Sequence, residues 1–144
     1  YRMSVHDPNL ALDNLAKSLA KALPHRRVRR SLVMSAADLP DAEMADGVVC
    51  VVCEGGGDFA NYMGREGQLG HLQVSLVGFV RVAERDEPAE VERAELELLR
   101  ELLAWTADPG EIRAGDSVLP LDFMQSRQLE HPYGWVVLKL DVRP

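Results

Sequence analysis

The chain has 144 residues, of which 47% are hydrophobic and 27% are charged, and its formal net charge is −7. This length suits a single domain over residues 1–144 with one hydrophobic core, and the apolar fraction is too high for a disordered chain. The acidic balance argues against a protein whose whole surface binds nucleic acid, and no apolar run approaches the roughly 18 residues of a membrane span or forms a signal peptide.

The first predicted element is an amphipathic helix over Leu10–Leu23, where apolar residues return every three or four positions. Asp7 suits the cap position before this helix, and Pro24 ends it because proline has no backbone N–H to donate. We expect a short, basic strand over Arg27–Val33. A loop follows over Ser35–Gly47, which contains several turn-forming residues.

The middle of the chain contains the two clearest strands. Val48–Cys53 is a continuous β-branched run, which is typical of a strand covered on both faces. His71–Val82 alternates between apolar and polar residues and predicts a second strand, paired with the first as a hairpin. The segment between them, Gly55–Gly70, carries six glycines and is long for a hairpin loop. Long glycine-rich loops in compact domains are usually functional or disordered.

The last third predicts one more helix and two more strands. Pro88–Trp105 has a broad apolar stripe at helical spacing, while Val118–Phe123 and Gly134–Val142 have the pattern of strands. Two helices with one apolar stripe each must cover a sheet. We therefore predict an α+β fold, in which a mixed, largely antiparallel sheet of four to five strands carries both helices on one face.

The two cysteines, Cys50 and Cys53, have the spacing of redox and zinc sites but lie inside a predicted strand. Residues three apart on a strand point to opposite faces, so the two sulfur atoms cannot converge on a metal. No second pair of cysteine or histidine residues stands nearby to complete a tetrahedral site. We expect two buried, reduced, structural cysteines and no metal.

No motif in the sequence predicts a cofactor or a catalytic centre. The glycines at 55–57 and 64–70 lack the Gly-Lys-Ser/Thr sequence of a phosphate-binding loop, and a strand rather than a helix follows them. No Gly-x-Ser-x-Gly sequence frames a nucleophile, and no two histidines stand three or four residues apart. We expect a protein that is not an enzyme and holds no cofactor.

Four arginines, Arg26, Arg27, Arg29 and Arg30, form the strongest charge cluster. They are either the solvated charges of an edge strand, which block aggregation, or a contact patch for an acidic partner or a phosphate backbone. The acidic residues of the second helix are most simply a solvated face, with Arg93 and Arg100 pairing to glutamates three positions earlier. They are Glu90, Glu92, Glu95, Glu97 and Glu101.

The glycine-rich loop carries the second candidate contact surface. Its large apolar and charged side chains have nothing nearby in sequence to bury them, and aromatic and arginine residues are enriched where proteins bind each other. We predict that the loop contacts a partner; the alternative is a hairpin end with no role. The residues concerned are Asp58, Phe59, Tyr62, Met63, Arg65 and Glu66.

The order of these segments resembles a known family. A helix ending at Pro24, a basic strand, the loop around 38–40, two long strands, an acidic helix and the closing stretch Gln128–Asp141 together look like the minor tail protein U family, the tail terminators of long-tailed bacteriophages and prophages. The resemblance covers nearly the whole chain. It lies in the order and character of the segments rather than in one short motif.

This resemblance implies a structural protein of the virion tail, assembled in the host cytoplasm, with no catalysis and no cofactor. Its partners would be further copies of itself in a ring, expected to be a hexamer, together with the tail tube protein and the head connector. The ring would cap the tail tube, end its polymerisation and present the head-joining surface, with the loop Gly55–Gly70 used for assembly. It would not bind nucleic acid tightly and would not associate with a membrane.

Three other classes remain open on the sequence. One is a different head–tail connector or completion protein, which the virion component that it binds would distinguish. Another is a small ligand-binding or regulatory α+β domain, which needs a concave apolar pocket with convergent polar groups. The third is an enzyme with a dispersed site, which needs perturbed ionisable groups converging in a cleft.

Overall fold

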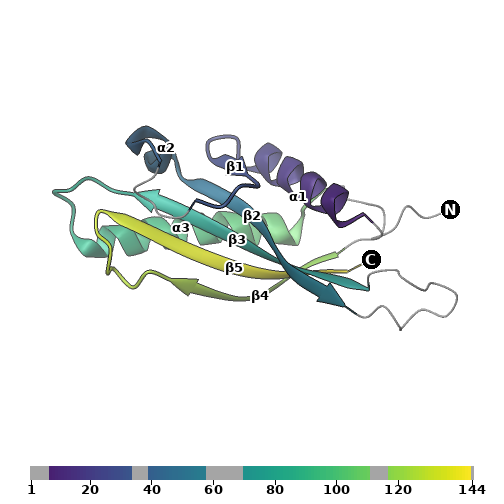
Figure 1. Cartoon of the computed structure of the whole chain (residues 1–144). Helices are drawn as coiled ribbons and strands as arrows, with labels where there is room; N and C mark the ends of the chain where they lie inside the picture. Colours follow the sequence, from purple (N-terminus) through teal and green to yellow (C-terminus); the bar gives the residue numbers. More distant parts are fainter. Residues whose placement is uncertain (1–6, 34–38, 58–69, 111–116, 144) are drawn as a thin grey trace, which may run out of the picture.

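The computed structural model describes residues 7–33, 39–57, 70–110 and 117–143, which form one five-stranded sheet and three helices (Figure 1). The strands lie in the order β1-β2-β3-β5-β4, so β1 and β4 are the two edges. β1 pairs with β2 in parallel, and the other three pairings are antiparallel. The mixed, largely antiparallel sheet confirms the predicted α+β class. The strands are β1 (Arg27–Arg29), β2 (Val48–Gly57), β3 (His71–Arg81), β4 (Ser117–Gln125) and β5 (Tyr133–Arg143).

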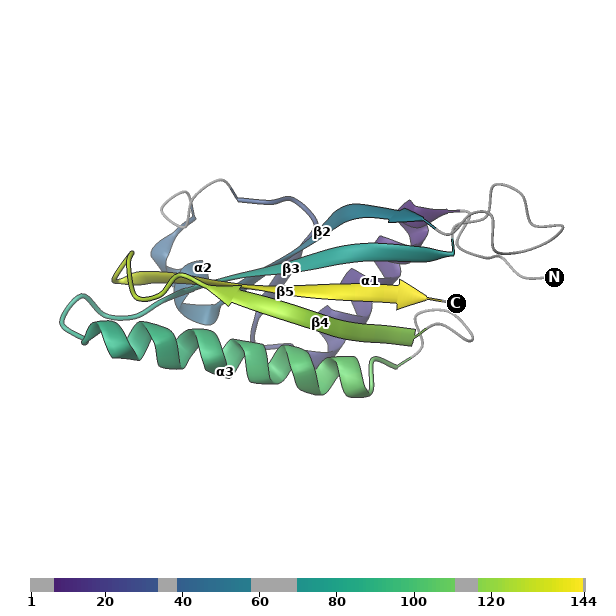
Figure 2. The same ribbon diagram turned by 90° about the horizontal axis from the view of Figure 1, so that it is seen from below.

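Two long helices cover one face of the sheet, as predicted. They are α1 (Pro8–Ala22) and α3 (Pro88–Ala107), and Figure 2 shows α3 running alongside β4 and β5. The side chain of Asp7 caps α1 by accepting a 3.0 Å hydrogen bond from the backbone N–H of Leu10. The leucine stripes of both helices meet alternate residues of the strands in the main hydrophobic core, which includes Leu15, Leu19, Val74, Leu98, Leu102, Leu138 and Leu140.

A third, short helix lies on the opposite face, where the sequence predicts only a loop. α2 (Asp41–Asp46) buries Met44 against Val48, Cys50 and Phe79, and this small second core covers only part of that face. Six residues are too few to show a helical period in the sequence, and tertiary packing stabilises so short a helix. None of the described helices combines the length and the apolar character that crossing a membrane requires.

Two strand ends differ from the prediction by four residues each, and the remaining differences are of one or two residues. β1 ends at Arg29 rather than at Val33, and β2 continues past Cys53 through the glycines to Gly57. The register of β2 against β3 shifts between Cys53 and Gly55, and Gly55 has a φ of 141° there. Glycine adopts that backbone conformation without a side-chain clash, so the glycines extend the strand through an irregularity instead of ending it.

Candidate functional site

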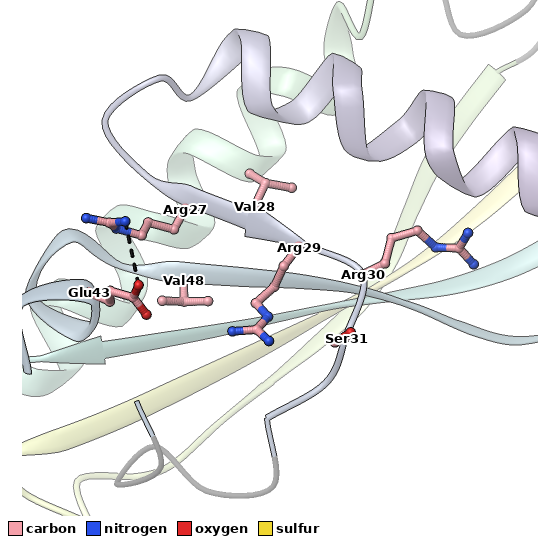
Figure 3. A pocket seen from close by; sticks show the side chains of 7 residues that line it. All are labelled: Arg27, Val28, Arg29, Arg30, Ser31, Glu43 and Val48. Carbon is pink, nitrogen blue, oxygen red and sulfur yellow. Dashed lines mark ion pairs between the residues drawn. The ribbon is translucent and has the colours of Figure 1, made fainter. Parts of the chain in front are cut away.

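The basic edge of the sheet contains a shallow pocket beside β1. The pocket has a volume of about 490 Å³, and its lining comes from β1 and the two residues after it, from α2 and from the start of β2 (Figure 3). It is lined by Arg27, Val28, Arg29, Arg30, Ser31, Glu43 and Val48. Three of the four arginines singled out in the sequence therefore gather at one place on the edge.

These three arginines differ in their partners. Arg27 lies 3.6 Å from Glu43 and 3.4 Å from Asp46, and Arg30 lies 2.8 Å from Asp13. Arg29 is exposed and forms no ion pair within the described part of the chain. In Figure 3, Arg27 is directed towards the Glu43 carboxylate while Arg29 extends past β2. Among the arginines that line the pocket, Arg29 is thus the one that no carboxylate of the described residues neutralises.

Arg26 does not belong to the exposed patch, so the expectation of one four-arginine surface is corrected. Its side chain is only 13% exposed and binds the Glu101 carboxylate of α3 with two hydrogen bonds, of 3.1 Å from Nε and 2.7 Å from Nη2. The His25 ring lies 2.9 Å from the same carboxylate. Burial alone would raise the pKa of Glu101, but the hydrogen bonds and charges of Arg26 and His25 outweigh it and lower that pKa.

The opposite edge, β4, is long and apolar. Only one of its nine residues, Asp122, is charged, and only Val118 is buried. The turn after β4 adds a further exposed leucine, Leu129. The large exposed apolar side chains here are Leu119, Leu121, Phe123, Met124 and Leu129. Native proteins usually protect an edge strand with charge or a cover, so an edge this apolar is a candidate contact surface.

The sequence predicts a strand here but no site. The stretch from Val118 to Met124 is apolar at nearly every position, which by pattern alone resembles a strand buried on both faces. This stretch is exposed because β4 lies at the edge of the sheet. The local sequence pattern does not reveal the order in which the strands pair.

A buried carboxylate holds the end of β4 in place. Glu95 of α3 is fully buried and accepts hydrogen bonds from the Ser126 hydroxyl, from the Gln125 amide at 3.2 Å and from the Trp135 backbone N–H at 2.9 Å. The prediction that Glu95 belongs to a solvated helix face is wrong, and Glu101 is mostly buried as well. Gly134 allows this close approach, since a Cβ there would lie 2.4 Å from the Glu95 carboxylate.

The remaining acidic residues of α3 behave largely as the sequence predicted. Arg93 pairs with Glu90 and Arg100 pairs with Glu97, each three positions apart on the exposed side of the helix. Glu92 is half-buried and accepts a hydrogen bond from the Gln128 amide in the turn after β4. α3 therefore combines a solvated stripe with carboxylates that bind the rest of the fold.

The two cysteines point to opposite faces, but only one is buried. Cys50 packs beneath α2, whereas Cys53 is exposed, which corrects the prediction that both are buried. Burial raises the pKa of the Cys50 thiol, despite the opposing effects of a backbone hydrogen bond at Val33 and the charge of Arg29. Among the described residues, no three histidine, cysteine or acidic side chains are placed to hold a metal ion.

The predicted loop contact residues lie outside the described residues. They are Asp58, Phe59, Tyr62, Met63, Arg65 and Glu66. The two surfaces that the structure does describe are the basic edge at β1 and the apolar edge at β4. No protein-family model matches this chain, and no curated protein matches it.

Proposed function

We propose that this chain is a structural subunit of a phage tail, one that forms a ring on the end of the tail tube, ends its polymerisation and presents a surface to the head connector. The segment order that resembles the tail terminator family supports this proposal. The mixed α+β sheet with two helices on one face is also the kind of fold that the resemblance implies.

The observation that carries the proposal is the unlike character of the two sheet edges. One edge is short and basic, and the other is long and apolar. Subunits that join through two different surfaces make heterologous contacts, and such contacts generate closed rings when the rotation between subunits closes. A ring subunit needs two surfaces of this kind on opposite sides.

The ring acts mechanically and requires no cofactor. Each copy carries a formal charge of −7, so copies repel each other at low ionic strength. Salt screens this repulsion over a distance of about 10 Å at 0.1 M. We therefore expect moderate salt to favour assembly, which is the opposite of its effect on an interface held mainly by ion pairs.

Molar mass measured by light scattering across a concentration series and at two salt concentrations tests ring formation. The expected result is a transition from monomer to one discrete oligomer of about sixfold mass. A second assay adds the chain to polymerising tail tube subunits of the same phage, where tubes should stop growing and bind the chain at one end. A chain that stays monomeric and leaves tube length unchanged would overturn the proposal.

The same assays separate the closest alternative. A different head–tail connector would bind the head component without stopping tube growth. We also expect no tight binding to duplex DNA at physiological salt, because Arg26, Arg27 and Arg30 already bind carboxylates and few charges remain for phosphates. Fluorescence anisotropy with a labelled duplex measures this directly.

A further inference from the structure

We propose that β4 of one copy lies antiparallel against β1 of the next copy, with Asp122 paired to Arg29 of that neighbouring copy. This inference rests on the ring proposed above and names the contact that builds it. The partner is a second copy of this chain, and the contact joins the two unlike edges of the sheet.

The directions of the strands fit this contact. β1 runs parallel to β2, and each following step across the sheet, from β2 to β3, β5 and β4, is antiparallel. β1 and β4 of one subunit therefore run in opposite directions. When copies stand side by side with the same orientation along a common axis, β4 of one meets β1 of the next in antiparallel fashion, which is the pairing of a regular sheet.

The two charged side chains also lie on the same face of the sheet. Arg29 is opposite Cys50 in the register, and Cys50 belongs to the face that carries α2. Asp122 is opposite Lys139, which alternates with the core residues Leu138 and Leu140 and so points to that same face. A sheet continued from one copy into the next therefore places Asp122 and Arg29 on a shared surface.

Both charges are open for such a pair. Arg29 and Asp122 are exposed, and within the described residues neither forms an ion pair, although Lys139 stands opposite Asp122 in the sheet. Asp122 is also the only charge on β4. A pair between them would fix the register of the two edges, because charge complementarity sets register more than it sets affinity.

The apolar side chains supply the rest of the contact. Leu121 and Phe123 of β4 are exposed, and Leu32, which follows β1 on the other edge, is 50% exposed. The outer sides of β1 and β4 have no strand partner in the described sheet. Joining the edges covers apolar surface and unpaired main-chain groups together, in a chain whose acidic charge otherwise keeps copies apart.

Charge reversal tests the pair. Arg29→Glu alone and Asp122→Lys alone should each weaken association by about tenfold, since a reversal removes an attraction and adds a repulsion. The double variant should recover most of the wild-type association. Arg93→Glu, which reverses an exposed arginine on α3, is the matched control and should associate like wild type. Light scattering gives the association, and circular dichroism verifies that every variant folds.

Disulfide trapping gives an independent readout on a Cys50→Ala, Cys53→Ser background, because Cys50 lies opposite Arg29 in the sheet and would compete for a cysteine placed there. A chain with Asp122→Cys mixed with a chain with Arg29→Cys should form cross-linked pairs on oxidation, and neither chain alone should do so. A double charge variant that associates no better than the singles, or an Asp122→Cys chain that cross-links to itself, would overturn the contact. If wild type forms rings and both reversals leave them intact, the contact is wrong and the ring stands. If the wild-type chain never associates, both the contact and the ring are wrong.

Discussion

The two edges of the sheet are held by the same helix through different chemistry. At the basic edge, Glu101 of α3 binds the guanidinium of Arg26 just before β1. At the apolar edge, Glu95 of the same helix accepts hydrogen bonds from uncharged groups just after β4. One glutamate thus makes an ion pair near the surface, and the other satisfies three donors in the interior.

This difference matches what each edge exposes. The basic edge is three residues long and has its own charges for protection, so it needs only an anchor at its start. The apolar edge is nine residues long and exposes large side chains, so its far end must be fixed if they are to form a defined surface. If the two anchors differ in this way, loss of Glu95 should destabilise the fold more than loss of Glu101.

Removing the Glu95 carboxylate should cause the largest loss in the free energy of unfolding. Glu95→Ala leaves the donors of Ser126, Gln125 and the Trp135 N–H without an acceptor, and we expect a loss of about 3 kcal/mol in the free energy of unfolding. Urea denaturation measures this loss. Glu97→Ala, on the exposed side of α3, is the control, and equal unfolding midpoints for the two variants would contradict the role of Glu95.

Removing the Glu101 carboxylate at the basic edge should lower the free energy of unfolding by a smaller amount, and this amount should depend on pH. The folded-state pKa of Glu101 is lowered, so its contribution is fully present above its unfolded pKa of about 4.3 and is lost as the pH falls through the folded pKa. We expect Glu101→Gln to cost about 1 to 2 kcal/mol at pH 7. The difference from wild type should shrink on acidification.

Urea denaturation of both proteins between pH 7 and pH 3 measures that difference. Glu97→Gln removes an exposed partner of Arg100 and serves as the control, with little cost expected at any pH. A Glu101→Gln difference that is constant with pH would show that the ion pair with Arg26 is not its source.

The smallest expected effect is a difference in the rates at which the two thiols near the basic edge are modified. Cys50 lies one strand in from that edge, opposite Arg29, and is buried beneath α2, whereas Cys53 is exposed. We expect a thiol reagent to modify Cys53 rapidly and Cys50 only when this region opens. Mass spectrometry of Cys50→Ser and Cys53→Ser variants separates the two rates, and equal rates would mean that α2 does not shield Cys50.

The sequence was sufficient to predict the two long helices and the central hairpin, because the helices and the second hairpin strand have a sustained period and the first hairpin strand is a β-branched run. Leu10–Leu23 and Pro88–Trp105 repeat at helical spacing, and His71–Val82 alternates as a strand does. The short helix at 41–46 was missed, since it is stabilised by burying Met44 rather than by its own pattern. The extent of β2 was missed because glycines normally end a strand.

The candidate surfaces were only partly predictable. The arginine cluster was visible as a charge run, but which arginine turns inward depends on the distant Glu101. Glu95 looked like any other acidic residue of a helix, because its donors come from residues some 30 to 40 positions later in the chain. The apolar edge was identified as a strand and not as a surface, since only the strand order places it outermost.

Hydrogen exchange measured at low and at high protein concentration tests most directly whether copies join through their two unlike edges. We predict that backbone amides of residues 117–125 and 27–29 gain protection as the chain associates, while those of the central strands β3 and β5 stay unchanged. Association with protection confined to the exposed side of α3, and none at either edge, would contradict this.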